Sequence, residues 1–327
     1  MELNTNVIQN QSRGRAFWRK FSGEYSVILI TIAVVVVATV MSGESFMTLN
    51  NWLNILRNNA VIGILALGMT FVIIAGEIDL SVGSALVAVG AIVLAVLNAS
   101  GSVVLAVLAG VGVGAGFGLG TGFIVTKGRV PSFIVTLGLM YIYRSISMYF
   151  MQGGGFTGDI KTYQLISNYN IGDVVPLPII YFAVIAVAFY YLSKHTKLGR
   201  YVYATGSNIK ATRLSGIDVD KVKILTFVLM GLSVAFSAII ESSRMNSINA
   251  SSSGTAYEMN AIAMAVVGGA SMAGGRGTIV GTIFGILIIG IINNILTLLG
   301  VDPFLVNAVK GVIVILAVLF QKKEVER

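Results

Sequence analysis

The sequence has no cysteine and a single histidine, His195. Without thiols the chain cannot form disulfides or thiolate metal sites, and one imidazole cannot build a multi-histidine metal site. Only 11% of its 327 residues are charged, against about 25% in a typical soluble domain. No large soluble domain, metal site, cofactor or catalytic centre is therefore expected.

Hydrophobic residues make up 56% of the chain and cluster into runs close to the roughly 20 residues that a membrane helix needs. In lipid the backbone must satisfy its own hydrogen bonds, so these runs are expected to be helices. We predict an all-α membrane protein with about ten transmembrane helices, at about 27–42, 58–75, 81–98, 103–125, 132–151, 178–193, 223–241, 259–272, 279–299 and 304–320.

The net charge of +8 arises from basic residues that favour one side of this arrangement. With the N-terminus inside, 17 of the 22 lysines and arginines fall in cytoplasmic segments, as the positive-inside rule requires. This asymmetry explains the positive charge better than nucleic-acid binding does. We predict a cytoplasmic tail over 1–26, a transmembrane domain over 27–320 with a cytoplasmic loop at 194–223, and a cytoplasmic tail over 321–327.

Two stretches of the chain resemble each other weakly. Residues 68–97 and 263–292 each read as an apolar run, a polar glycine-containing break and a second apolar run. Internal repeats of this kind are common in transporters, whose sites lie near interrupted helices. The pattern favours a transporter with a pseudo-repeat.

The first break carries two carboxylates, Glu77 and Asp79, followed by Ser81. A carboxylate in the middle of a bilayer costs about 3 kcal/mol, so both should face water, protein or a helix N-terminus. Asp79 is placed to cap the next helix by accepting from a backbone N–H. The functional alternative is that these three residues contact a solute or form a gate.

The second break, 268–277, has five glycines and superficially resembles a phosphate-binding loop. It lacks the Lys-Ser/Thr pair that grips phosphate and magnesium, and no strand precedes it. The chain has no such motif elsewhere, so it is not expected to hydrolyse ATP. The glycines indicate a tight turn or broken helix with close backbone packing.

Glycines also recur along one apolar run. Gly110, Gly114, Gly118 and Gly122 form one small-residue stripe, and Gly112, Gly116 and Gly120 form a second on another face. This arrangement predicts a helix packed between neighbours on both sides. Gly277, Gly281 and Gly285 make a similar stripe.

The longest cytoplasmic connection, 194–223, contains a short amphipathic helix at 209–215. Asn208 is the predicted N-cap, Gly206 and Gly216 set the turns, and Leu214 and Ile217 are apolar anchors. So short a helix needs something to pack on, which is either its own protein or a partner.

Two polar segments, 153–178 and 241–258, are predicted to lie outside. They are either solvated loops or surfaces that meet a hydroxylated ligand or a soluble partner. The candidate pathway residues around the second segment are Asn246, Asn249, Glu258 and Asn260.

Three motifs carry a specific resemblance: GMTFVIIAGEIDLSVGS (68–84), LGRYVYATGSNIKATRLSGI (198–217), and YEMNAIAMAVVGGASMAGGRGTIVGT (257–282) continued by NNILTLLGV (293–301). In order and spacing the chain resembles, from about residue 46 to its end, the permeases of bacterial ABC importers for ribose and related sugars. Glu77 departs from the small residue, such as glycine, more usual there, and 153–160 also differs.

The resemblance implies a fold like that of the vitamin B12 importer, with two permease copies forming one pathway in the bacterial cytoplasmic membrane. A cytoplasmic ATP-binding subunit, often a fused double ATPase, would bind 199–217, and a periplasmic or lipid-anchored protein would deliver a monosaccharide. The residues implied in coupling to the ATPase are Gly199, Arg200, Gly206, Asn208, Arg213, Leu214, Gly216 and Ile217.

The sequence leaves two other function classes to consider. An ion-coupled secondary transporter of a small polar solute would need a buried titratable group, for which Glu77 and Asp79 are the candidates. A membrane enzyme would need a nucleophile–base pair or metal cluster, and the sequence shows neither. Ribose, another pentose, a hexose or a furanose signalling molecule all remain open as the substrate.

Overall fold

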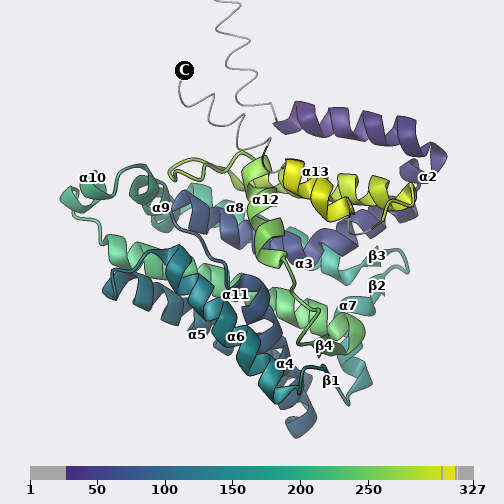
Figure 1. Cartoon of the computed structure of the whole chain (residues 1–327), viewed down its shortest axis with the longest axis horizontal. Coiled ribbons are helices and arrows are strands. Elements are labelled where there is room, and N and C mark those ends of the chain that lie inside the picture. The colour runs from purple at the N-terminus through teal and green to yellow at the C-terminus, as the bar shows by residue number, and fades with distance from the viewer. Residues whose placement is uncertain (1–26, 303–304, 314, 316–327) are drawn as a thin grey trace, which may run out of the picture.

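The computed structural model describes residues 27–302, 305–313 and 315 (Figure 1). Within this part, seven helices are long and apolar enough to cross a membrane, and two shorter apolar helices span Val27–Ser42 and Tyr257–Val267. The seven are α3 (Leu49–Ile74), α4 (Val82–Ser100), α5 (Val103–Lys127), α6 (Ser132–Phe150), α8 (Leu177–His195), α11 (Val219–Met245) and α13 (Ile279–Leu298).

These helices match the predicted all-α membrane protein, with local differences. The second helix begins at Leu49, nine residues before the predicted start, because Thr48 caps it by accepting from the Asn51 N–H. The eighth predicted span is shorter than expected, since α12 (Tyr257–Val267) ends before the glycine-rich break. The tenth, 304–320, lies largely outside the described residues, although 305–313 is helical.

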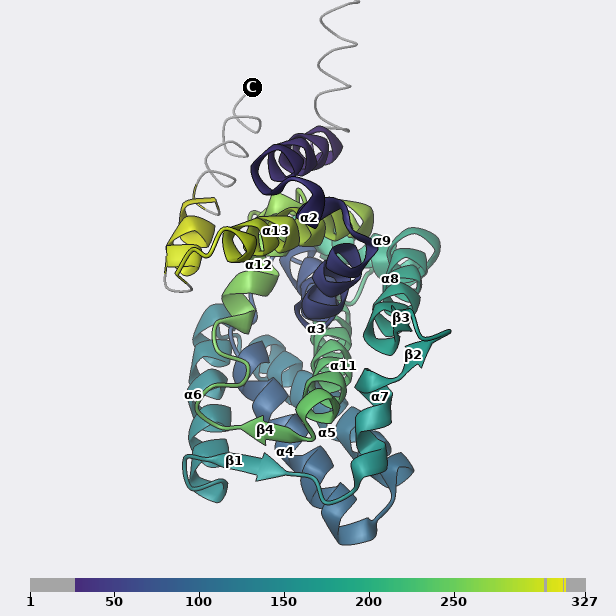
Figure 2. The ribbon, with the colours of Figure 1, turned by 90° about the vertical axis from the view of Figure 1, so that its right-hand side faces the viewer.

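The core of the fold is α11, which packs against α3, α4 and α5. Figure 2 shows α3 and α11 in the interior, with α6 and α8 on opposite sides. Most of the apolar side chains of α6 are exposed, including Phe133, Ile142 and Tyr149, whereas those of α3 are largely buried. The chain therefore presents an apolar outer face, as a membrane protein does.

Only one of the two glycine stripes on α5 packs within the described chain. A Cβ on Gly118 would lie 2.8 Å from the carbonyl carbon of Phe227 and 2.9 Å from Val228 Cα, so α5 and α11 are in backbone contact there. A Cβ added at Gly112, Gly116 or Gly120 would have no neighbour within 4 Å among the described residues. Within the described chain this helix therefore has a packed neighbour on the first stripe, while the second stripe faces outward.

The pseudo-repeat predicted from sequence is visible as two helix–break–helix units, α3–α4 and α12–α13. Their breaks touch each other: the Gly275 N–H donates to the Ile74 carbonyl over 2.8 Å, and a Cβ on Gly274 would lie 3.1 Å from Gly76 Cα. Gly274, Gly275 and Gly277 all have positive φ angles, which side chains disfavour. The glycine-rich break therefore provides close backbone packing, as predicted.

The two ends of the helix bundle carry different structures. At one end lie α9 (Lys197–Ser207) and α10 (Ile209–Leu214), and at the other lie short strands and α7 (Leu165–Asn168) (Figure 1). Strand β1 (Gly155–Thr157) pairs antiparallel with β4 (Ser247–Asn249), and β2 (Asn170–Ile171) pairs with β3 (Val175–Pro176). The pairing of β1 with β4 joins the two polar segments predicted to lie outside.

We expect thiol labelling to report opposite sides of the membrane for these two ends. Leu165 and Lys210 are both exposed, and the native chain has no cysteine to interfere. Leu165→Cys in intact cells should react with a membrane-impermeant maleimide, whereas Lys210→Cys should react only after permeabilisation. The reverse pattern would contradict the assignment of 194–223 to the cytoplasm.

Candidate functional site

The end of the bundle that was predicted to face the cytoplasm is built around the two short helices α9 and α10. The Asn208 side chain caps α10 by accepting from the Ala211 N–H over 3.0 Å, and Gly216 turns the chain at φ +78°, both as predicted. The sequence prediction missed α9, an 11-residue helix whose buried Val202 packs into the same core as Ile217. The element that another protein could bind is thus a pair of helices, α9 and α10, rather than one helix.

The two predicted anchors of α10 behave differently. Ile217 is partly buried against the apolar cluster that contains Val202 and Val222, so it fixes the loop to its own protein. Leu214 is 90% exposed and meets no part of the described chain that would cover it. An exposed leucine at the tip of a fixed helix is available to another molecule.

A small network of charged residues lies beside α10. Arg213 and Lys127 both pair with Asp220, at 3.3 and 3.2 Å, and Arg200 is exposed on α9. Because these pairs are open to solvent, each contributes about 0–1 kcal/mol to stability. They link α10 to the start of α11 and the end of α5.

Gly206 and Gly199 allow close contacts rather than turns. A Cβ on Gly206 would overlap the Ile74 carbonyl and lie 2.6 Å from the Gly275 nitrogen, so the end of α9 is wedged between both halves of the pseudo-repeat. The prediction that Gly206 sets a turn is therefore wrong, since it lies inside α9. Tyr203 strengthens this junction by donating to the Gly277 carbonyl over 2.7 Å, and burial raises the pKa of its phenol. Gly199 packs just as closely on the carbonyls of Leu192 and Ser193.

Glu77 lies at the same junction and forms an ion pair with Lys223 at the start of α11. Their side chains are only 9% and 17% exposed, so this pair is shielded from water far more than those on Asp220. In this arrangement Glu77 ties the first break to α11, and its carboxylate is engaged within the chain.

Replacing Glu77 with Gln should lower thermal stability, because it leaves the Lys223 ammonium shielded from water without its counter-charge. Lys223→Met in the same chain should restore part of the loss. The two changes should couple by about 0.5–3 kcal/mol in a double-mutant cycle read from unfolding midpoints. Strict additivity would show that the pair contributes nothing to the junction.

Asp79 is buried and bonds to the start of the next helix. Its Oδ1 accepts from the Ser81 N–H at 2.8 Å and from the Ser81 hydroxyl at 2.6 Å, as the capping interpretation expects. Burial raises the pKa of Asp79, and the two bonds from Ser81 oppose that rise. The same loop bonds to α6, where the side chains of Ser132 and Thr136 accept from the N–H groups of Ile78 and Leu80.

The asparagines at the opposite end bond to the local backbone. Asn246 adopts a left-handed conformation that ends α11, and its Nδ2 donates to the Gly158 carbonyl over 2.6 Å. Asn249 Oδ1 accepts from the N–H groups of Ser251 and Ser252 and so closes a turn. Both side chains shape the link between the two polar segments that β1 and β4 join.

Glu258 and Asn260 lie in the first turn of α12. Asn260 bonds to the Ala256 carbonyl, whereas Glu258 Oε2 lies 2.6 Å from the position of a Cβ on Gly83, beside the first turn of α4. The structure therefore places the predicted pathway residues in three groups: Glu77, Asp79 and Ser81 in the first break, Asn246 and Asn249 near β4, and Glu258 and Asn260 on α12.

Arg144 is a residue that the sequence reasoning did not select. It lies inside the membrane-spanning helix α6 and donates through Nη1 to the carbonyls of Ala250 and Ser253, both at 2.8 Å. An arginine deep in a membrane costs at least about 2.5–3.5 kcal/mol, which makes it a functional candidate by default. A lone arginine within an apolar run was the signal that could have found it.

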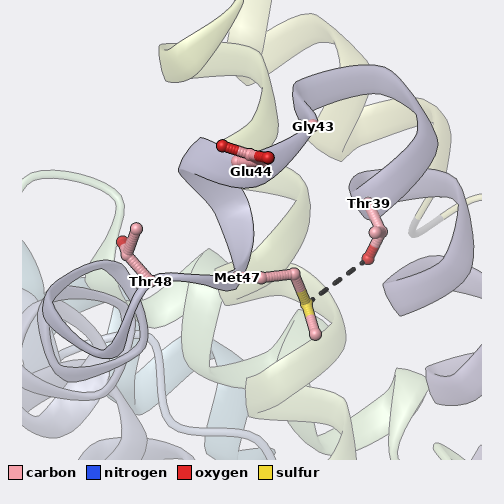
Figure 3. Close-up of a pocket in the computed structure, with 5 residues that line it drawn as sticks. All are labelled: Thr39, Gly43, Glu44, Met47 and Thr48. Atoms are coloured by element: carbon pink, nitrogen blue, oxygen red, sulfur yellow. Dashed lines mark hydrogen bonds between the residues drawn. The ribbon is translucent and has the colours of Figure 1, made fainter.

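A shallow hollow beside the helix Val27–Ser42 is lined by Thr39, Gly43, Glu44, Met47 and Thr48 (Figure 3). The Thr39 hydroxyl in it bonds to the Val35 carbonyl and lies 3.6 Å from Met47 Sδ, and the Thr48 hydroxyl bonds to the Ser45 carbonyl. A small-molecule site requires several polar groups that converge on the ligand, and these hydroxyls are engaged within the chain.

The fold and these surfaces define a multi-pass membrane protein of the permease class, with an exposed helix tip at one end and charged residues within its helical core. The chain matches the family described as branched-chain amino acid transport system / permease component over residues 51–318. It belongs to that family. No solved structure matches it.

Curated relatives agree with this assignment over almost the full length. The chain is 42% identical over 316 residues to the ribose import permease protein RbsC of Escherichia coli K12, covering 95% of this chain and 98% of the relative. It is 40% identical to the protein of the same name in Bacillus subtilis, covering 89% and 90%. It is 32% identical to the xylose transport system permease protein XylH of Haemophilus influenzae, covering 89% and 94%.

Proposed function

We propose that this chain is the membrane-spanning subunit of an ATP-driven importer for a monosaccharide, ribose or a related sugar. Relatives named for ribose import cover nearly the whole chain, and a relative named for xylose transport supports the same substrate class. The permease performs no chemistry. It changes the side of the membrane from which the sugar pathway is open.

The observation that carries the coupling part of this proposal is the exposed α9–α10 pair. Leu214 projects from a helix that Asn208 caps and Ile217 fixes, while Gly206 wedges α9 against both repeat breaks. A movement imposed on α10 by an ATPase would pass through backbone contacts at Ile74 and Gly275. Because these backbone atoms are already in close contact, α9 cannot shift alone, and the pairs α3–α4 and α12–α13 would move with it.

The complete assembly in this proposal contains a second permease copy, ATP-binding subunits on the α9–α10 face, and a sugar-binding protein on the β1–β4 face. Ten spans per chain, both termini in the cytoplasm and a fold like that of the vitamin B12 importer belong to the same proposal. The outward-facing stripe of Gly112, Gly116 and Gly120 and the exposed apolar face of α6 are compatible with contacts to lipid or to a second copy.

Uptake in reconstituted vesicles tests the energy source. Vesicles that contain the permease, its ATPase and the sugar-binding protein should accumulate radiolabelled ribose only when ATP is present on the ATPase side. Vesicles with the permease alone and an imposed proton or sodium gradient should accumulate none. Gradient-driven uptake without the ATPase would replace this proposal with an ion-coupled secondary transporter.

A further inference from the structure

Arg144 of α6 and Glu258 of α12 both lie beside the backbone contact between Gly83 and Gly254: Arg144 bonds to the adjacent Ser253 carbonyl, and the Glu258 carboxylate lies against Gly83. The loop after α3 leads inward to the start of α4, and the start of α12 lies beside it (Figure 1). Gly83 of α4 and Gly254 before α12 are in backbone contact, and the Glu258 carboxylate lies against them. Two helix N-termini, each the positive end of a dipole, therefore point into the region that contains Glu258.

Arg144 reaches this region from α6 with most of its hydrogen-bonding capacity unused. A guanidinium has five N–H donors, and Arg144 uses only Nη1, in its bonds to Ala250 and Ser253. Within the described part of the chain, Nε and Nη2 form no hydrogen bond or ion pair. The two Nη1 bonds hold the side chain in place while the remaining donors stay available.

Glu258 supplies the complementary acceptor. Arg144 bonds to Ser253, the residue before Gly254, and Glu258 lies beside Gly83, which contacts Gly254; the two charged groups still form no direct ion pair within 4.0 Å in the part of the chain described. Both side chains are partly buried. This differs from Glu77 and Lys223, which contact each other directly and so satisfy each other.

We propose that Arg144 and Glu258 bind two neighbouring hydroxyl groups of the sugar in transit, with Arg144 donating to one and Glu258 accepting from the other. A hydroxyl is both donor and acceptor, so a vicinal diol can bridge a guanidinium and a carboxylate that do not touch. Hydrogen bonds to charged groups are stronger than neutral ones, and a sugar lacking one hydroxyl would leave a partly buried charge unpaired. This inference rests on the proposed function and adds the residues that discriminate between sugars.

The test compares ribose with 2-deoxyribose in vesicles that contain the permease, its ATPase and excess sugar-loaded binding protein. The variants are Glu258→Gln and Arg144→Met, with Glu44→Gln as a control because Glu44 is an exposed carboxylate on the distant helix α2 (Glu44–Met47). We expect each site variant to lower the maximal ribose uptake rate about tenfold or more, as loss of a charged hydrogen bond does. The ratio of ribose to 2-deoxyribose uptake should fall toward one, and Glu44→Gln should leave rate and ratio unchanged.

A purely structural role would lower the uptake of both sugars equally and leave their ratio unchanged, and that result overturns the proposal. If Arg144→Met fails to assemble, Glu258→Gln decides alone, because the Glu258 carboxylate accepts from its own backbone N–H, a bond that the amide oxygen of a Gln of the same size can also accept. Unchanged uptake and ratio for Glu258→Gln would also overturn it. A different result would contradict the proposed importer function itself: the unmodified protein would take up sugar without ATP.

Discussion

Leu214→Asp should abolish co-purification of the permease with its ATPase and stop ATP-driven sugar uptake. Leu214 is 90% exposed at the tip of α10, so in the permease alone the new carboxylate stays in water and should not lower stability. If the ATPase covers this side chain, the same carboxylate becomes buried without a partner, which costs several kcal/mol. A loss of that size lowers a binding constant by about two or more powers of ten.

The measurements are detergent pull-down with the tagged ATPase, sugar uptake in the same membranes, and the unfolding midpoint of the purified permease. Leu165→Asp is the matched control, because Leu165 is 55% exposed at the opposite end of the molecule. That variant should keep full ATPase binding. Normal ATPase binding and uptake by Leu214→Asp would eliminate α10 as the docking element.

Gly118→Leu should prevent stable folding, whereas Gly116→Leu two residues away should be tolerated. A side chain at position 118 meets the backbone of Phe227 and Val228, which α11 can relieve only by moving away from α5. Overpacking costs about 1–3 kcal/mol even where side chains can adjust, and backbone atoms cannot rotate away. At position 116 nothing in the described chain lies within 4 Å of the new Cβ.

Expression level, size-exclusion profile and unfolding midpoint of the purified chain distinguish these cases. Gly118→Ala should already lower the unfolding midpoint, since the alanine Cβ alone would lie too close to the backbone of α11. Equal yields and midpoints for the two leucine variants would contradict the packing of α5 on α11. Normal folding of Gly116→Leu combined with lost permease dimerisation would instead assign the second stripe to contacts between copies.

The amino-acid sequence by itself determined the features that depend on local composition. Apolar runs define membrane helices because lipid offers the backbone no partner, and this physics is independent of what packs beside each run. Asn208 and Gly216 define the ends of α10 because a capping bond and a left-handed turn involve only neighbouring residues. The motifs at 68–84, 198–217 and 257–282 were likewise sufficient to indicate the family.

The tertiary structure decided the features that depend on distant segments. Two glycine stripes on one helix look alike in sequence, and only the position of α11 shows that Gly118 packs while Gly116 does not. Glu77 and Asp79 are close candidates in the chain, yet one pairs with Lys223 and the other accepts from Ser81, the residue before α4. Arg144 and Glu258 are 114 residues apart in sequence (258 − 144), and they become neighbours because α4, α6 and α12 converge there. Such contacts arise from the packing of whole helices, which the periodicity of a single segment does not specify.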